Sequence, residues 1–186
     1  MARITAGQFK GRLLDIPKHI RATEAKVRQA LFNILGAAIL HARVVDGFAG
    51  SGALGLEALS RGAEFVAFIE SDADAIISIK DNLERFEADL ADDSWRLIQF
   101  DMERALPQLA RLEPPFDIMI FDPPYNTDDG KKALNSVVEY AMLAPAGIAV
   151  IEHNRRTDVP ETVGFLRKIK QHRYGDTVLS FYHTNA

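Results

Sequence analysis

Residues 43–55 read RVVDGFAGSGALG, and this stretch decides the fold class. Its two valines have the β-branched side chains that favour a strand, and its leucine begins a segment with helical character. Gly50, Gly52 and Gly55 between them have the G-x-G-x-x-G spacing, which allows a ligand to lie against the backbone and the N-terminus of a helix. We therefore predict a strand, a ligand-binding loop and a helix; a tight turn that merely needs glycine is the alternative.

Short apolar runs alternate with helical segments after this loop. Further strands are expected at 65–69, 97–100, 116–121, 148–151, 165–169 and 177–182, and helices at 54–60, 74–86, 102–112 and 131–143. Strands that are apolar throughout and alternate with helices imply a parallel sheet covered on both faces. We predict an α/β fold with a mostly parallel seven-stranded sheet, helices on both faces and a C-terminal antiparallel hairpin around Tyr174-Gly175-Asp176.

The N-terminal part has a different character. Residues 3–6 and 12–16 are expected to pair as a short hairpin, and a helix with Thr23 as its N-cap should follow. Residues 1–43 contain eight Lys or Arg and two acids, a net charge of +6, so the other residues hold −10 of the total of −4. We predict two parts, a basic extension (1–42) and a ligand-binding domain (43–186); a solvated terminus of no special function is the alternative.

Composition excludes several classes of protein. The 186 residues include 47% hydrophobic and 26% charged residues, as in a globular protein. There is no apolar run long enough to span a membrane, and the first twenty residues do not resemble a secretory signal. Cysteine is absent, which excludes disulfides and a cysteine nucleophile, and the five histidines lack ligand spacing. A cytoplasmic protein without a metal is expected, and its oligomeric state cannot be predicted.

Acidic residues end two of the predicted strands. Glu70 lies 18 residues after Gly52, close to the spacing of an acid that binds both ribose hydroxyls of a nucleotide. Asp101 could accept a hydrogen bond from an adenine amino group while Met102 packs on the ring, and it could equally cap the following helix. Both acids are therefore candidates for binding a nucleoside.

The most specific motif is Asp122-Pro123-Pro124-Tyr125, directly after the strand at 116–121. Two prolines fix the backbone and remove two donors, which leaves the Asp122 side chain and the Pro123 carbonyl as rigid acceptors. Such acceptors suit a planar exocyclic amine, and Tyr125 could stack on the base that carries it. The motif therefore predicts a site that orients an NH2 group toward an electrophile.

With this motif the chain resembles the class I S-adenosylmethionine-dependent methyltransferases that modify amino groups, whose signature is (D/N/S)PP(Y/F). The resemblance is closest to the RsmD family, which methylates guanine N2 in small-subunit (16S) ribosomal RNA. It is carried by Arg3-Ile4, Gly7, residues 10–13, Arg21, Thr23, Val27-Arg28, residues 31–33 and the stretch DGFAGSGALGLEALSRGA at 46–63. The chain departs from the family at Ala22, where proline is usual, and this leaves the entry to the following helix less rigid.

This resemblance implies a Rossmann-like class I fold and a role for each motif. The predicted cofactor residues are Asp46, Phe48, Ala49, Gly50, Ser51 and Gly52 for the methionine part, Glu70 and Ser71 for the ribose, Asp101 and Met102 for the adenine, and Asp122 beside the methyl group. The catalytic residues would be Asp122, Pro123, Pro124 and Tyr125. The RNA contacts would be Arg3, Lys10, Arg12, Arg21, Lys26, Arg28 and Asn33.

The implied reaction converts S-adenosyl-L-methionine to S-adenosyl-L-homocysteine and methylates 16S ribosomal RNA, either free or within a partly assembled small subunit. Four rival functions share part of the pattern. They are methylation of DNA at adenine N6 or cytosine N4, methylation of a protein glutamine, hydride transfer with a nicotinamide cofactor, and RNA binding without catalysis. The nicotinamide alternative leaves Asp122–Tyr125 unexplained.

Overall fold

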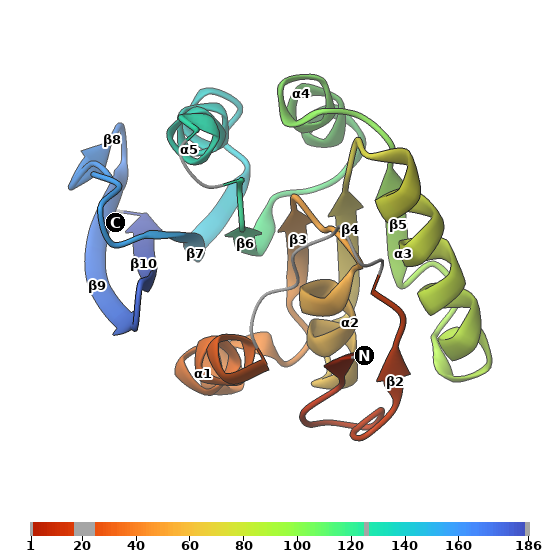
Figure 1. The fold of residues 1–186 in the computed structure, drawn as a ribbon. Coiled ribbons are helices and arrows are strands. Elements are labelled where there is room, and N and C mark those ends of the chain that lie inside the picture. The colour runs from red at the N-terminus through yellow and green to blue at the C-terminus, as the bar shows by residue number, and fades with distance from the viewer. Residues whose placement is uncertain (1, 17–24, 125–126, 185–186) are drawn as a thin grey trace.

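The computed structural model describes residues 2–16, 25–124 and 127–184. An eight-stranded sheet with the order β5-β4-β3-β6-β7-β10-β9-β8 runs through the centre of the molecule (Figure 1). Its strands are β3 (Arg43–Gly47), β4 (Phe65–Ile69), β5 (Trp95–Ile98), β6 (Phe116–Phe121), β7 (Leu143–Asn154), β8 (Thr162–Val163), β9 (Leu166–Tyr174) and β10 (Thr177–Thr184). Neighbours from β5 to β7 are parallel, and β10, β9 and β8 are antiparallel to their neighbours.

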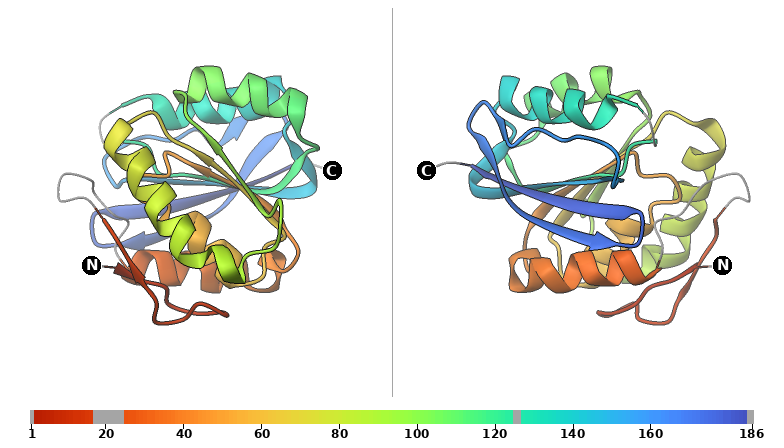
Figure 2. Two further views of the ribbon diagram at one scale, coloured as in Figure 1. Left: turned by 90° about the vertical axis from the view of Figure 1, so that its right-hand side faces the viewer. Right: turned by 60° about the vertical axis from the view of Figure 1, so that its left-hand side comes forward.

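Helices cover both faces of this sheet (Figure 2). One face carries α1 (Ala25–Leu35), α2 (Ala53–Ser60) and α3 (Ala73–Phe86), and the other carries α4 (Met102–Leu112) and α5 (Asp129–Glu139). Short 3-10 turns follow α1 (Gly36–Ile39) and α3 (Glu87–Asp89). Because β4 and β6 are covered on both sides, their residues are apolar almost throughout, which confirms the prediction of a mostly parallel α/β sheet.

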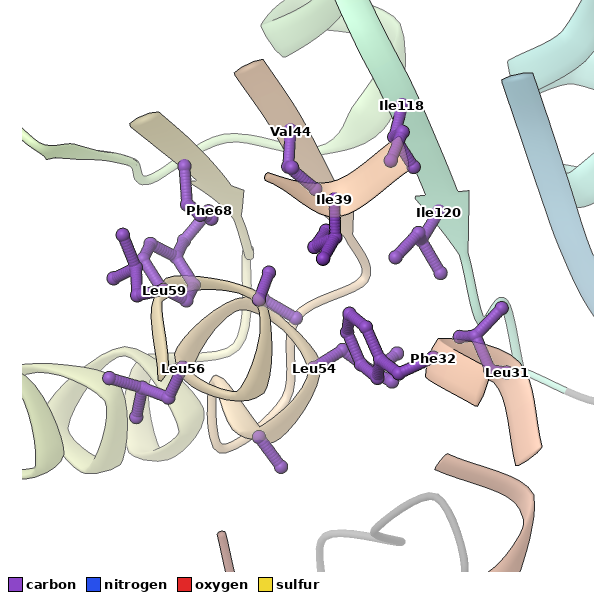
Figure 3. Packing of buried hydrophobic residues seen from close by; sticks show 14 of the residues in the cluster. Leu31, Phe32, Ile39, Val44, Leu54, Leu56, Leu59, Phe68, Ile118 and Ile120 are labelled. Atoms are coloured by element: carbon purple, nitrogen blue, oxygen red, sulfur yellow. The ribbon is translucent and has the colours of Figure 1, made fainter. Parts of the chain in front are cut away.

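A continuous hydrophobic cluster joins α1 and α2 to their face of the sheet. Leu31 and Phe32 of α1 and Leu54 of α2 point toward Val44 and Ile120 in the strands (Figure 3). All five side chains are at most 5% exposed, and burying a side chain of this size contributes about 1.5–3 kcal/mol. This packing fixes where β3 ends and α2 begins, and so positions the loop between them.

The N-terminal hairpin is shorter than predicted. Its strands are β1 (Ala2–Arg3) and β2 (Leu13–Leu14), and its turn closes through the Ile4 N–H on the Arg12 carbonyl at 3.0 Å. Ile4, with Phe9 and Leu14, is buried in the same hydrophobic cluster as α1 and α2. The division at residue 42 stays a prediction, although the described part of the extension shares a core with the sheet domain.

The structure corrects several boundaries. The sheet has eight strands rather than seven, because Thr162–Val163 pairs with Leu166–Arg167 across Gly164, a pairing too short to leave a pattern in the sequence. The helix expected at 131–143 ends at Glu139, and the chain turns through Ala141 (φ of 48°) into β7. The predicted N-cap, Thr23, lies outside the described residues. No helix in the described part of the chain is long and apolar enough to cross a membrane.

Candidate active site

The glycine-rich loop has the backbone conformation that its sequence requires. The φ angles of Gly50 (56°) and Gly52 (76°) are in the left-handed region, which glycine adopts without strain. Phe48 (62°) has the same conformation, which is unusual for a residue with a bulky side chain. A Cβ on Gly55 would lie 2.2 Å from the Phe68 ring, so glycine at this position allows α2 to pack directly on β4. The predicted strand, loop and helix are confirmed.

Asp46 lies beneath this loop and is fully buried. Its Oδ2 accepts the Gly55 N–H at 2.7 Å, and its Oδ1 has no hydrogen-bond partner among the described residues. Burial raises the pKa of Asp46 well above its ordinary value of 3.8, and the negative charges of Asp122 and Glu70 raise that pKa further. Asp46 therefore holds the loop in place and carries an electrostatic cost.

Replacing Asp46 by asparagine is expected to remove that cost in a pH-dependent way. Because its pKa is higher in the folded protein than in the unfolded chain, the folded state keeps a proton that the unfolded chain loses, and stability falls as pH rises above about 4. The difference in the free energy of unfolding, D46N minus wild type, should therefore increase as pH increases. Urea denaturation between about pH 4 and 8 tests this, and a constant difference would contradict the raised pKa.

Glu70, at the end of β4, binds the backbone of two loops. Its Oε2 accepts the Gly50 N–H at 2.8 Å, and its Oε1 accepts the N–H groups of Ser71 (2.7 Å) and Asp72 (2.9 Å). A carboxylate has about four acceptor positions, so three are in use. Glu70 must release at least one backbone N–H before it can accept from both hydroxyls of a ribose, and that role stays a prediction.

A cavity of about 810 Å³ opens where the parallel strands end. Sites for small molecules have this size, and the position matches the switch point of an open sheet, where strand order runs outward from β3 in both directions. The cavity brings together eight predicted residues: Phe48, Glu70, Ser71, Asp101, Met102, Asp122, Pro123 and Pro124. The predicted residues Asp46, Ala49, Gly50, Ser51 and Gly52 do not line it; they build the loop that supports its wall.

Asp101 and its neighbours form one end of the cavity. Asp101 caps α4, since its Oδ1 accepts the Arg104 N–H at 2.9 Å, and the N-cap role is confirmed. Sequence reasoning missed Phe100, which is 44% exposed and lines the cavity beside Met102. A large aromatic residue directly before an N-cap acid was the available signal, and its ring suits the face of a nucleobase.

The lining of the cavity as a whole is strongly charged. Six carboxylates line it, from Glu70, Asp72, Asp101, Glu103, Asp122 and Asp129, against one ammonium group, that of Lys132. Lys132 is itself held by Glu103 (3.2 Å) and Asp129 (3.8 Å). The excess of negative charge favours a ligand that carries positive charge. The described residues contain no group of three or more His, Asp or Glu placed to hold a metal.

Asp122, Pro123 and Pro124 form the wall at the end of β6. Asp122 is half-buried and its N–H donates to the Gly47 carbonyl at 3.3 Å. Pro123 is buried, whereas Pro124 is exposed and its carbonyl accepts from the Thr127 hydroxyl at 2.9 Å. The motif is therefore held to the end of β3 on one side and to the turn before α5 on the other. Tyr125 lies outside the described residues, so its stacking role stays a prediction.

Most of the predicted RNA contacts are at the surface. Arg3, Lys10, Arg12, Lys26 and Asn33 are exposed, and Arg21 lies outside the described residues. The Arg3 guanidinium donates to the Gly11 carbonyl at 3.0 Å, and that of Arg12 pairs with Asp89 and lies over two aromatic rings. These residues are accessible to a polyanion.

Arg28 is the exception, and the structure corrects its predicted role. Its side chain is completely buried, with Nε 3.4 Å from the Glu57 carboxylate and one terminal nitrogen donating to the Arg3 carbonyl at 2.6 Å. A guanidinium in this position cannot reach an RNA phosphate. Arg28 anchors the N-terminal hairpin instead.

A mostly parallel sheet that ends in an antiparallel hairpin, with an Asp-Pro-Pro motif lining a cavity where the parallel strands end, is the arrangement of the class I methyltransferase fold. The family described as "Conserved hypothetical protein 95" matches residues 2–183. "Putative rRNA methyltransferase YlbH" of Bacillus subtilis is 39% identical over 182 residues, 97% of each chain. "Ribosomal RNA small subunit methyltransferase D" of Escherichia coli is 34% identical over 160 residues, 85% of this chain and 77% of that protein.

A solved structure with the same fold supports the assignment made from these relatives. The structure titled "Putative methyltransferase yhhF from Escherichia coli" superposes with a TM-score of 0.84 and is 32% identical, over 100% of this chain and 98% of that one. The chain belongs to the RsmD family of methyltransferases.

Proposed function

We propose that this protein transfers a methyl group from S-adenosyl-L-methionine to the exocyclic N2 amine of a guanine in 16S ribosomal RNA. The observation that carries the proposal is the position of Asp122-Pro123-Pro124 on the wall of the cavity that also holds Glu70 and Asp101. The motif proposed to orient the amine and the acids proposed to bind the nucleoside thus line one cavity. The names of the relatives in Bacillus subtilis and Escherichia coli support ribosomal RNA as the substrate.

The cavity fits S-adenosylmethionine chemically. Its acidic walls favour a cationic ligand, and Phe100 and Met102 offer apolar surface to an adenine ring beside the Asp101 carboxylate. Glu70 lines the same cavity and would bind the ribose in exchange for a backbone N–H. Phe48 would contact the methionine part. When bound, the cofactor supplies a methyl group on positively charged sulfur, and a new N–C bond replaces the S–C bond while the amine loses one proton.

The contribution of the protein itself is mainly orientation. Asp122 would accept hydrogen bonds from the guanine amine and direct the nitrogen lone pair into the cavity. Correct placement of two reactants can lower a barrier by about 7–11 kcal/mol. No strong base is needed, because the methylated amine releases its proton easily. A guanine within a helix must be flipped out of its stack or already unpaired to reach this wall.

Replacing Glu70 by alanine is expected to weaken binding of S-adenosylhomocysteine by about 1.5–3 kcal/mol, the size of a hydrogen bond to a charged group. The variant loses the ribose acceptor and also the anchor of the Gly50 and Ser71 N–H groups. Isothermal calorimetry measures the effect. Glu84→Ala, at an exposed position of α3, is the matched control, and equal affinities of both variants would count against the assignment of Glu70.

A nucleoside assay tests the proposed function itself. The purified protein, S-adenosylmethionine and small-subunit ribosomal RNA should yield N2-methylguanosine at one position. RNA with inosine at that position is the matched control, because inosine lacks only the N2 amine, and it should accept no methyl group. Methylation of the inosine RNA, or methylated adenine, cytosine or protein glutamine as the product, would refute the assignment to guanine N2.

A further inference from the structure

We propose that a second RNA-binding surface lies at the C-terminal hairpin, on the side of the active site away from the N-terminal extension. This C-terminal basic surface consists of Arg155, Arg156, Lys168 and Arg173, and it would bind phosphates next to the methylated nucleotide. The choice of RNA as its ligand rests on the proposed function.

The local charge is opposite to that of the whole protein. Residues 155–173 contain six Lys or Arg and two acids, so they carry +4 in a chain whose net charge is −4. All four residues of the C-terminal basic surface line one groove of about 520 Å³ between the segment after β7 and strand β9. A concentration of positive charge in a groove raises the local concentration of a polyanion.

Two arginines of this groove have no carboxylate partner among the described residues, and its four basic side chains outnumber the two acids that also line it, Asp158 and Glu161. Arg155 pairs with Asp176 at 2.7 Å and Lys168 pairs with Glu161 at 2.5 Å. In the part of the chain that the structure describes, Arg156 and Arg173 are exposed and form no ion pair with a carboxylate. The Arg173 Nε donates to the Gly175 carbonyl at 2.9 Å, which orients its guanidinium while leaving its charge available. Arginine in this state is well suited to a phosphate.

The groove adjoins the catalytic wall. A small hollow has Pro123 and Pro124 on one side and His153, Thr157 and Val159 on the other, and the last three residues also line the basic groove. Strand β7 ends at Asn154, opposite Thr177 of β10, so the C-terminal basic surface begins at the sheet edge where β6 delivers Asp122. Arg155 and Arg156 thus follow directly after the strand that lies next to β6.

The two basic regions lie on opposite sides of the amine site. In Figure 1 the N-terminal hairpin lies next to α2, whereas β9 and β10 lie beyond β7, on the other side of β6. The hairpin is fixed there by the Gln8 N–H on the Ser60 carbonyl at 2.8 Å. RNA that contacts both regions would cross the wall formed by Pro123 and Pro124, which presents one nucleotide to the cavity.

The test is the double variant Arg156→Ala/Arg173→Ala, compared with the wild type for binding to small-subunit ribosomal RNA at several salt concentrations. Each phosphate contact contributes about 0.7–0.9 to the slope of log affinity against log salt. The double variant should therefore bind more weakly at low salt, with a slope shallower by about 1.4–1.8. Arg111→Ala, an exposed arginine in the last turn of α4, is the control and should leave the slope unchanged.

Binding of S-adenosylhomocysteine and the melting temperature should be the same in all three proteins. An unchanged RNA affinity and salt slope in the double variant would overturn the proposal, and so would an equal loss in Arg111→Ala. Weaker binding to ribosomal proteins with unchanged RNA binding would assign the surface to a protein partner and also overturn it. If the wild type binds RNA with the expected slopes but does not methylate it, the proposed function fails and the C-terminal basic surface stands.

Discussion

Asp122→Ala is expected to lower the rate of methyl transfer by about 10²–10³-fold, the loss typical when one preorganised hydrogen-bonding group is removed from a reaction site. Asp122 is the side chain that would hold the amine, and its backbone is already fixed by the Gly47 carbonyl and by Pro123. The variant therefore removes the proposed acceptor, while the backbone hydrogen bond to Gly47 and the ring of Pro123 remain. Single-turnover transfer of a labelled methyl group to small-subunit ribosomal RNA measures the effect.

Two further variants test whether this loss is specific to the Asp122 carboxylate. Asp122→Asn keeps one acceptor oxygen and should retain more activity than the alanine variant. Asp81→Ala, at an exposed position of α3, should transfer methyl groups at the wild-type rate. Affinity for S-adenosylhomocysteine should change less than the rate in each case. Near-normal turnover of Asp122→Ala would remove this residue from the mechanism.

Glu57→Ala is expected to destabilise the protein by about 3–5 kcal/mol, the cost of leaving a buried charge without its partner. Glu57 is completely buried on α2. One carboxylate oxygen accepts from the Thr5 hydroxyl (2.6 Å) and the Arg61 Nε (2.8 Å), and the other accepts the Thr5 N–H (2.8 Å) and lies 3.4 Å from the Arg28 Nε. Burial lowers the pKa of Arg28, and the charge of Glu57 opposes this effect. Removing Glu57 alone would therefore leave the buried charge of Arg28 without its partner.

Urea denaturation measures the free energy of unfolding. Glu57→Gln should be less harmful than the alanine variant, because its amide oxygen still accepts from Thr5. Glu64→Ala, at an exposed position before β4, should cost less than about 0.5 kcal/mol. A loss below about 1 kcal/mol for Glu57→Ala would mean that water or another group compensates Arg28.

The features that the sequence predicts well are local. The glycine-rich loop, the acids at the ends of β4 and β5 and the Asp-Pro-Pro motif each depend on a few consecutive residues, and the topology of a parallel sheet brings strand ends to one edge. Their convergence on one cavity follows from that topology. The α4 helix was predicted with its observed bounds because its N-cap and its apolar spacing are both in the sequence.

What sequence reasoning missed depends on long-range packing. The burial of Arg28 requires Glu57, which lies 29 residues further along the chain. The sequence around Arg28 does not predict that partner. Lys132 lines the cavity because of the rotation of α5 on the sheet, which helical periodicity does not specify. The three backbone contacts of Glu70 depend on the meeting of two loops, and the basic character of residues 155–173 is hidden by the acidic average of the sheet domain.

The most direct test of the central claim is mass spectrometry of ribosomal RNA nucleosides from cells that lack this protein. We expect one N2-methylguanosine to disappear from the small-subunit RNA, to return with the wild-type gene, and not to return with the Asp122→Ala variant. A modification profile that is unchanged by the deletion, or that the Asp122→Ala variant restores in full, would contradict this claim.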